Sequence, residues 1–568
     1  MGGLRVALLS FSFQPVRPWP TRPNPQMASA AAGFIIRSGT NLFDPSTNTT
    51  LRFVSFNTPT LSLQDDPSFV VPTPFEQDDL LSSIQQMGSR VVRMYALSVQ
   101  MPSETATATK HIVKSATDGK IGLQEVVMRG LDSALALARQ RNVKVIIPLI
   151  DRWEWWGGIS SFVQLVDASL PTSAFFTNTA VISSFKSIIV QLLTRNNTVN
   201  GIPYRNDSTV MLWETGNELE LDDGKTPAAW TRDIAAYIRS FDSQHLIMDG
   251  SFKHGWDAEV LADPNIDVFS NHFYRNFVPT TGEWALWAVL TAILIIAMVM
   301  LCMLVWSPRK IKVVREAKGT DVKRSTRLKQ LLLAIVALGA MAGAGAGIAV
   351  QVLHRVENPR YGDSSASDAV TVASYNKAYI VGEFGFSAVA SIQDVIGNVV
   401  RKQEALAGAL VWSLRGHSSA GGMYTHKEAH DYQSYHFPGF PAAPGFGPDE
   451  QEVINAVKTG AQQIAAQTGF SIPAATLPVP PTLLNATSPA LTWRGSAGAS
   501  SYSVERADAA AATPTWTVVG SQVMDNVPQN KTLFTDSSSV RGVPYLYRVR
   551  ANNALGTGNA SNAVTITG

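Results

Sequence analysis

Residues 213–218, Trp-Glu-Thr-Gly-Asn-Glu, follow a short apolar run, Val210 to Leu212, that is typical of a buried strand. This strand therefore ends beside an Asn and a Glu. A second carboxylate, Glu383, follows another apolar run in Val381-Gly382-Glu383-Phe384-Gly385. Two glutamates that flank one cleft are able to break a glycosidic bond, because one protonates the leaving oxygen while the other attacks the anomeric carbon. Glu218 is the predicted proton donor of such a pair.

Eight short apolar runs recur along the chain from Phe34 onward, and helical patterns separate most of them. Near-continuous apolar strands of this kind favour a closed parallel (β/α)8 TIM barrel, with a doubly wound open sheet as the alternative. The barrel is favoured because polar and aromatic residues fall at the C-terminal ends of many different strands, where such barrels carry their active sites. The predicted strands are Phe53–Phe56, Arg90–Met94, Val143–Leu149, Val210–Trp213, Leu246–Asp249, Val268–Ser270, Ala378–Val381 and Gly408–Trp412, and the clearest helices are Gln77–Met87, Leu123–Arg141, Thr179–Arg195 and Thr231–Phe241.

A chain of 568 residues is long enough for one domain of about 250 residues or more and a smaller one. Residues 1–33 are predicted to be a leader, either a weak signal peptide or a disordered segment. The other predicted divisions are the catalytic barrel at 34–283 and 354–470, an insertion after the sixth strand at 284–353, a Pro- and Ala-rich linker at 471–478 and a C-terminal domain at 479–568.

The C-terminal domain is predicted to be a small all-β sandwich, because its apolar runs are short, alternating and regularly spaced. Trp493, Tyr502 and Tyr547 are its expected core aromatics. The segment Tyr547-Arg548-Val549-Arg550-Ala551-Asn552 resembles the penultimate strand of fibronectin type III domains. We expect a structural or display role, with carbohydrate binding as the alternative.

Two long apolar runs form the insertion. Residues 284–306 and 331–353 are each 23 residues without a charge, and each is long enough to cross a hydrocarbon core of about 30 Å. Trp284, Trp287 and Trp306 lie near the ends of the first run, as interfacial anchors do. The runs predict a transmembrane hairpin that contacts the lipid bilayer, with two buried helices of a soluble domain as the alternative.

The charge of the loop between these runs predicts which side of the membrane the hairpin loop faces. Residues 307–330 contain nine Lys or Arg and two acidic residues, a local charge of +7. Basic loops stay on the cytoplasmic side of a membrane. Because two crossings return the chain to its starting side, the catalytic domain is expected to be extracellular or lumenal. Sequons compatible with secretory passage occur at Asn48, Asn196, Asn206, Asn485, Asn530 and Asn559.

Bulk charge gives no argument for nucleic acid binding, because the whole chain carries a net charge of only +2. Cys302 is the only cysteine, so cysteine usage does not indicate the compartment. The run His426-Lys427-Glu428-Ala429-His430 superficially resembles a zinc-binding helix, but its Glu is misplaced for either known order of His and Glu. We therefore predict neither a metal nor a cofactor.

Several motifs resemble the endo-β-mannanase branch of glycoside hydrolase family 5. The most specific are the two strand-end glutamates, Glu218 in Trp-Glu-x-x-Asn-Glu and Glu383 in Gly-Glu-x-Gly. The run Trp153-Glu154-Trp155-Trp156-Gly157-Gly158 is similar to the aromatic and glycine segment after that family's third strand. The resemblance covers about residues 34–467 apart from the apolar hairpin, and it implies a TIM barrel with glycosidase activity.

The resemblance also implies a role for each matching residue. Glu218 corresponds to the acid/base and Glu383 to the nucleophile. Asn217 corresponds to the residue that hydrogen-bonds the substrate 2-hydroxyl, and Arg93 to the arginine beside the nucleophile. The remaining matches line the cleft and are His272 and Tyr274 at the sixth strand and Trp412, the aromatic floor under the sugar, at the eighth.

Elementary chemistry supports these residue types. Glu383 must be ionised to attack, so the charge of Arg93 and a hydrogen bond from the Tyr274 phenol are expected to stabilise its carboxylate. Glu218 must keep its proton near neutral pH, which the nearby charge of Glu383 and partial burial favour. Flat indole faces suit the C–H surface of a pyranose ring, and the candidates are Trp412, Trp153, Trp155 and Trp156, although core packing explains the last two equally well.

Two positions depart from the family pattern. Leu219 stands where the mannanases usually have proline, and Thr215-Gly216 stands where bulkier residues are common. The departures leave the catalytic pair intact, but they leave the identity of the substrate sugar undetermined. The sequence predicts a membrane-anchored retaining glycoside hydrolase that cleaves a polysaccharide or oligosaccharide of β-1,4-mannan or a related β-glycan. The alternatives are a β-glucanase of the same family and a catalytically silent glycan-binding or adhesion protein.

Overall fold

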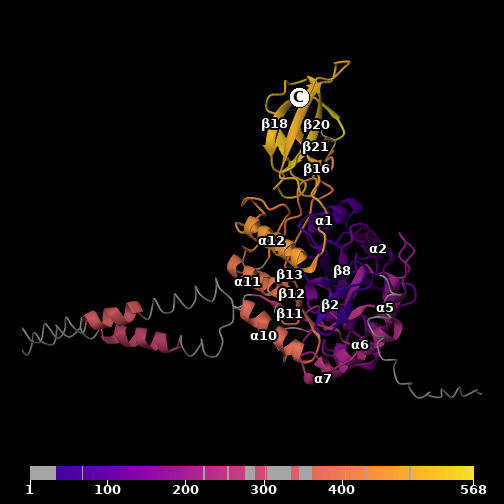
Figure 1. Cartoon of the computed structure of the whole chain (residues 1–568), viewed down its shortest axis with the longest axis vertical. Coiled ribbons are helices and arrows are strands. Elements are labelled where there is room, and N and C mark those ends of the chain that lie inside the picture. Colours follow the sequence, from indigo (N-terminus) through magenta and orange to yellow (C-terminus); the bar gives the residue numbers. More distant parts are fainter. Residues whose placement is uncertain are drawn as a thin grey trace, which may run out of the picture.

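The chain forms a large barrel with peripheral helices and a smaller β domain that carries the C-terminus (Figure 1). The predicted leader lies outside the described residues except for Gly33. The computed structural model describes residues 33–66, 68–221, 224–251, 255–274, 288–300, 302, 334–343, 361–402, 404–428, 431–484 and 488–567.

Eight parallel strands close into a barrel in sequential order, which confirms the predicted (β/α)8 fold and excludes the open sheet. Every residue of strands β4, β5, β8 and β9 is buried, as expected where helices cover the outside and side chains fill the inside. The barrel strands are β4 (Phe53–Thr58), β5 (Val91–Met94), β8 (Lys144–Pro148), β9 (Val210–Glu214), β10 (Leu246–Met248), β11 (Val268–Phe273), β12 (Ala378–Phe384) and β13 (Leu406–Val411).

Helices surround the barrel (Figure 1). The first begins at a reciprocal cap, in which the Thr73 side chain accepts from the Glu76 amide and the Glu76 side chain accepts from the Thr73 amide. All of the clearest predicted helices are present. The helices are α1 (Pro74–Gln86), α2 (Glu125–Gln140), α3 (Gly158–Val166), α4 (Ala174–Thr177), α5 (Thr179–Thr194), α6 (Ala228–Phe241), α7 (Ala258–Leu261), α10 (Tyr361–Ser374), α11 (Val389–Val400) and α12 (Glu450–Thr468), with 3-10 turns η2 (Glu154–Trp156) and η3 (Tyr204–Asn206).

A small antiparallel sheet closes the N-terminal end of the barrel. It consists of β1 (Ile36–Ser38), β2 (Asn41–Asp44) and β3 (Thr49–Leu51). Leu42 and Leu51 are fully buried in one cluster with residues that begin barrel strands, such as Phe53 and Val91. The sheet was not predicted, because its strands are too short to show a reliable alternation.

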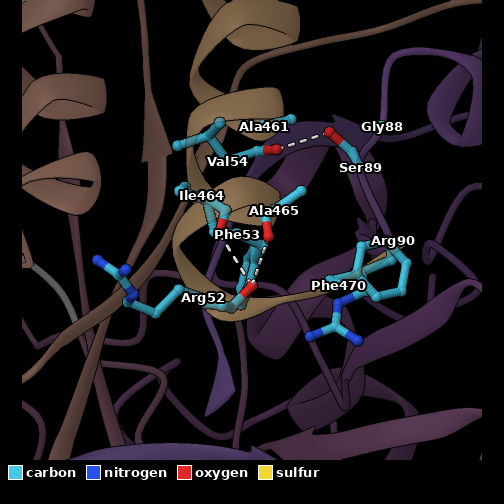
Figure 2. Close-up of a pocket in the computed structure, with 11 residues that line it drawn as sticks. Arg52, Phe53, Val54, Gly88, Ser89, Arg90, Ala461, Ile464, Ala465 and Phe470 are labelled. Atoms are coloured by element: carbon cyan, nitrogen blue, oxygen red, sulfur yellow. Dashed lines mark hydrogen bonds between the residues drawn. The ribbon is translucent and has the colours of Figure 1, made fainter. Parts of the chain in front are cut away.

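A pocket at this same end of the barrel is packed nearly shut by α12 and Phe470 (Figure 2). Its volume is only about 10 Å³, at the lower limit for a single water molecule. Ser89 donates a hydrogen bond of 2.6 Å to the Val54 carbonyl, and the guanidinium of Arg90 lies 4.1 Å from the Phe470 ring centroid. These contacts fill the pocket, so we interpret it as part of the packing between α12 and the barrel.

The C-terminal domain has the predicted all-β structure. Trp493, Tyr502 and Tyr547 are completely buried in its core, which confirms the predicted core aromatics. The likeness to a fibronectin type III domain stays a prediction. The main sheet contains β17 (Ser501–Asp508), β18 (Thr517–Val523), β20 (Pro544–Asn553), β21 (Gly556–Ala560) and β22 (Val564–Thr567), beside the short pairs β14 (Thr482–Leu483) with β16 (Trp493–Arg494) and β15 (Ala490–Leu491) with β19 (Phe534–Thr535).

The predicted transmembrane hairpin is not supported by the part of it that the structure describes. Within the two apolar runs, helix is described at residues 288–300 and 334–343, and Figure 1 draws both away from the barrel. Among all described residues, none of the helices is both long enough and apolar enough to span a bilayer. The rest of both runs and the basic loop, 307–330, lie outside the described residues.

A buried histidine joins the barrel to the β domain. His417, in the loop after β13, has Nδ1 2.9 Å from both carboxylate oxygens of Asp79 on α1. Its Nε2 lies 2.8 Å from the carboxylate of Asp525 in the β domain. Burial lowers the pKa of His417, but the two carboxylates outweigh it and raise the pKa to about 10. The imidazolium is therefore a charged bridge between the two domains at neutral pH.

We predict that this bridge gives the folded protein a characteristic dependence on pH. Because folding raises the pKa of His417 from 6.5 to about 10, its contribution is complete below pH 6.5, declines above it and is lost as the pH rises through about 10. His417→Gln should therefore flatten the fall in the free energy of unfolding across this window, measured by urea denaturation at a series of pH values. Equal slopes in the two proteins would contradict the charged bridge.

Candidate active site

The two predicted catalytic glutamates meet at the carboxyl end of the barrel. Glu383 lies in β12, and Glu218 lies just beyond the end of β9. Both are buried, with 3% and 5% of their surface exposed. Carboxylate oxygens of the two residues lie within 4.8 Å of each other. A retaining glycosidase separates its two carboxyl groups by about 5 to 5.5 Å, whereas an inverting one needs about 6.5 to 9.5 Å. The oxygens of this pair lie closer together than the inverting separation.

Glu383 receives the two partners expected from the sequence. Arg93 Nη1 donates to its Oε1 at 2.6 Å, and the Tyr274 hydroxyl donates to its Oε2 at 2.5 Å. Burial raises the pKa of Glu383, while the positive charges of His272 and Arg93 oppose the rise. The carboxylate therefore takes up a proton at a higher pH than an ordinary glutamate.

Glu218 has different partners. Trp153 Nε1 donates to its Oε2 at 2.5 Å, and His272 Nδ1 lies 2.8 Å from its Oε1. The backbone of Glu218 has a φ of +52°, in the left-handed region that a residue other than glycine rarely adopts. Strain of this kind costs about 1 to 3 kcal/mol and is concentrated at functional sites.

His272 lies between the two glutamates. Its Nδ1 is 2.8 Å from Glu218 and 3.6 Å from Glu383. The glycine before Glu383 makes this position possible, because a Cβ on Gly382 would stand 2.6 Å from His272 Nε2. The Gly-Glu sequence on β12 therefore has a steric reason that is separate from its chemistry.

Asn217 is held at both ends of its amide. Its oxygen accepts from Arg93 Nη2 at 2.7 Å, and its nitrogen donates to Asp151 at 3.0 Å and to the Tyr95 hydroxyl at 3.3 Å. Burial raises the pKa of Asp151 to about 7, although the hydrogen bond from Asn217 opposes the rise. These partners fix which end of the amide is the donor.

Arg93 is the hub of the site. Its side chain is completely buried, and it donates to Asn57, Asn217 and Glu383 as well as to both carboxylate oxygens of Glu214, at 2.7 and 2.9 Å. Burial raises the pKa of Glu214 to about 7 even though Arg93 opposes it. The planar guanidinium thus ties together side chains from β4, β5, β12 and the end of β9.

The predicted aromatic residues divide into two groups. Trp153 and Trp155 are 39% and 45% exposed, so their faces are accessible. Trp412 is 9% exposed, and its ring lies 5.4 Å from that of Tyr95. Trp156 is 1% exposed and donates from Nε1 to the Ala96 carbonyl at 2.6 Å. This indole therefore packs under the site, and its assignment to substrate binding stays a prediction.

The two departures from the family pattern have a structural basis. A Cβ on Gly216 would stand 2.6 Å from Leu219 Cδ1 and 3.0 Å from the Ile150 carbonyl oxygen, so a larger residue would need its neighbours to shift. Leu219 is fully buried, and its amide donates to the Gly250 carbonyl at 2.9 Å. Proline has no amide hydrogen and would lose this bond.

Several site residues were missed. They share one signal, because each lies within two residues after the end of a predicted strand, where a TIM barrel places its functional side chains. A rule that collected every polar residue at a strand end would have found them. The missed residues are Asn57, Tyr95, Asp151 and Glu214.

Two groups of donor atoms in the described part of the chain lie close enough together to share an ion. They are Glu218, His272 and Glu383, and Asp65, Asp66 and His426. In the first group the carboxylates bind Arg93, Tyr274 and Trp153. In the second, Asp66 is hydrogen-bonded to His426, and Asp65 pairs with Arg415 at 3.0 Å. Side-chain partners therefore occupy both donor sets.

Comparisons with known proteins give matches to a family model, to curated proteins and to solved structures. Residues 76–281 match the model of the GH family 5 beta-mannosidase-like proteins. "Mannan endo-1,4-beta-mannosidase 1" of Oryza sativa subsp. japonica is 34% identical over 22% of this chain and 31% of its own length. "Probable mannan endo-1,4-beta-mannosidase A" of Aspergillus oryzae is 24% identical over 46% of this chain and 68% of its own length. The chain thus spans about a third of the rice protein.

A solved structure, the glycoside hydrolase family 5 mannosidase from Rhizomucor miehei, covers 77% of this chain and 98% of its own, with a TM-score of 0.50 and 15% identity. It has the same fold. The matched proteins are of the glycoside hydrolase class. Within that class, residues 76–281 are similar to the GH family 5 mannosidase-like proteins.

We predict that Arg93→Lys lowers kcat/KM for a β-glycoside by about 100-fold, because an ammonium cannot replace the guanidinium fork at Glu383, Glu214 and Asn217. The acid limb of the pH profile, along which Glu383 becomes protonated, should move to higher pH, because lysine keeps the charge but loses the 2.6 Å hydrogen bond from Nη1 to Glu383. The matched control is Arg90→Lys, which changes a buried arginine paired with Asp44 at 3.2 Å beside the base pocket of Figure 2. An equal loss of activity in both variants would contradict the assignment.

Proposed function

We propose that the protein is a retaining glycoside hydrolase that cleaves β-1,4-linked mannan or a related β-glycan. The observation that carries the proposal is the pair of buried glutamates within 4.8 Å of each other, with different partners. Arg93 and Tyr274 surround Glu383, as a nucleophile that must be ionised requires. Trp153 and His272 contact Glu218, which carries the proton.

The proposed reaction proceeds in two displacements. In the first, a Glu383 oxygen forms a bond to the anomeric carbon while the glycosidic C–O bond breaks, and the leaving oxygen takes the proton of Glu218. In the second, water attacks the anomeric carbon, Glu218 takes a proton from that water, and the bond to Glu383 breaks. Asn217, whose amide is oriented by Arg93 and Asp151, binds the sugar 2-hydroxyl.

The choice of mannan rests on the relatives, whose names describe mannan endo-1,4-beta-mannosidases. Two alternatives define the outcomes of a test. A β-glucan could be the substrate with the same chemistry, or the cleft could bind glycan without turnover and serve adhesion. The exposed indoles of Trp153 and Trp155 suit any of these ligands, because they recognise the C–H face that pyranoses share.

We predict that the protein hydrolyses manno-oligosaccharides with retention of configuration at the anomeric centre. NMR of the first product formed measures this configuration. Glu218→Ala and Glu383→Ala should each lower kcat by about 1,000-fold or more. The control is Glu125→Ala, at an exposed glutamate on α2. A panel of β-glycans identifies the sugar. Binding without turnover in the parent protein would support adhesion, and inversion at the anomeric centre would overturn the mechanism.

We further propose that the catalytic domain is extracellular or lumenal and that residues 284–306 and 331–353 contact a bilayer. The proposal is supported by their uncharged sequence and by exposed apolar side chains in their described parts, such as Val289, Ile296 and Val336 at 56%, 59% and 63%. The fibronectin type III likeness of the C-terminal domain is part of the same proposal, since such domains are frequent outside cells.

This topology predicts a definite protease pattern in sealed microsomes, whose outer face is cytoplasmic. Protease should cleave within the basic loop, 307–330, and leave the barrel protected until detergent is added. Cleavage of the barrel with protection of the loop would reverse the orientation. Recovery of the intact chain in the supernatant after a carbonate wash would contradict membrane insertion.

A further inference from the structure

The loop after β13 begins with the indole that is the expected floor of the cleft. Trp412 Nε1 donates to Glu428 at 2.9 Å, and the Trp412 ring packs in one cluster with Tyr95 and Tyr274. Tyr274 in turn donates to the nucleophile Glu383. The position of Glu428 therefore affects the position of the Trp412 indole and, through it, the side chains that pack against this ring.

Glu428 is fixed by other residues of the same loop. Its Oε1 accepts from the hydroxyls of Ser413 and Ser434 at 3.4 and 3.3 Å. Arg415 donates to the Ser434 hydroxyl at 3.2 Å, and two residues further along is His417. A chain of polar contacts thus connects the indole of Trp412 with the middle of the loop.

The middle of the loop lies against the β domain in close backbone contact. The Met423 amide donates to the Val527 carbonyl at 3.0 Å, and the Gln529 amide donates back to the Met423 carbonyl at 2.9 Å. A Cβ on Gly422, where φ is +72°, would stand 2.7 Å from the Val527 carbonyl oxygen. The loop and the β domain therefore pair like two strands, with no room for a side chain between them.

His417 anchors this contact from the barrel side. It is 1% exposed and lies between Asp79 of α1 and Asp525 of the β domain. The hydroxyl of Tyr502 is also bonded to Asp525 and accepts from the Ser496 amide at 3.0 Å. Removal of one partner from such a buried charge pair leaves the other uncompensated, so each group constrains its neighbours.

We propose that the C-terminal β domain is a working part of the cleft, in which Asp525 and His417 are positioning residues that hold the loop after β13 and, through Glu428, the indole of Trp412 against the substrate. The inference rests on the proposed glycosidase function. It replaces the expectation that the C-terminal domain is a separate display or binding module. A module on a free linker would neither bury an ion pair with the barrel nor form backbone hydrogen bonds with the loop after β13.

The test compares two substitutions in the β domain. Asp525→Asn removes the charge that faces His417. Asp536→Asn removes an equally buried carboxylate that binds Arg506 and Tyr547 within the domain at 2.7 and 2.8 Å. We expect Asp525→Asn to raise KM for a manno-oligosaccharide by about fivefold to tenfold with kcat changed less than about twofold, since an indole stacked on the sugar contributes mainly to binding. Asp536→Asn should lower only the melting temperature.

A spectroscopic readout separates positioning from stability. The fluorescence difference between each protein and its Trp412→Phe partner isolates the Trp412 indole. This difference spectrum should shift to the red in Asp525→Asn and stay unchanged in Asp536→Asn. If the parent protein turned over no glycan, the proposed function would fail while the spectrum still decided the coupling. A lowered melting temperature with an unchanged KM and spectrum in Asp525→Asn would overturn the coupling alone.

A second pair of variants tests the backbone contact without changing a charge. Gly422→Ala places a Cβ against Val527, whereas Gly542→Ala, at a φ of +82°, meets nothing within 4 Å. The two share the conformational cost of a side chain at positive φ. Only Gly422→Ala should raise KM and shift the Trp412 spectrum. Equal effects, or none in either, would contradict the proposal.

Discussion

The site depends on the hydrogen bonds and ion pairs that the guanidinium of Arg93 makes. A buried charge is tolerated only when it is paired and fully hydrogen-bonded, and Arg93 meets this requirement with Asn57, Asn217, Glu214 and Glu383. Its partners come from strands far apart in the sequence, so they converge only when the barrel has closed. The site therefore forms only when the barrel strands are in place. Because a buried arginine without its partners is costly, the hydrogen bonds of Arg93 are expected to form together.

Close backbone approaches make room for this cluster. Gly216 and Gly250 bring the ends of β9 and β10 into contact, and Gly382 leaves space for the His272 ring beside the nucleophile. The same constraint acts at the loop after β13, where Gly422 meets the β domain. Each glycine is explained by what stands next to its missing side chain, and in each case that neighbour lies near the site or in the β domain against the loop after β13.

The sequence predicted the parts of the structure that repeat. Eight buried strands with period-two or continuous apolar character were recognisable, and their C-terminal ends located Glu218 and Glu383. What depended on packing between distant segments was not predictable. Trp156 and Trp155 are neighbours of the same type, yet one is buried and the other exposed, and only the fold separates them. Nothing local in the sequence marks Glu428 as the partner of Trp412, or Asp525 as the partner of His417.

The different roles that we propose for the two glutamates rest on their partners and not on burial. Glu218 and Glu383 are almost equally shielded from water, at 5% and 3% exposure, so desolvation alone would favour the neutral form of both. An arginine and a phenol face Glu383, whereas an indole N–H and an imidazole face Glu218. Like-charge repulsion within 4.8 Å then makes the second ionisation of the pair harder than the first. Arg93 contacts Glu383, whereas His272 lies between the two carboxylates and closer to Glu218. The mechanism that we propose assigns the charge to Glu383 and the proton to Glu218 before its first step.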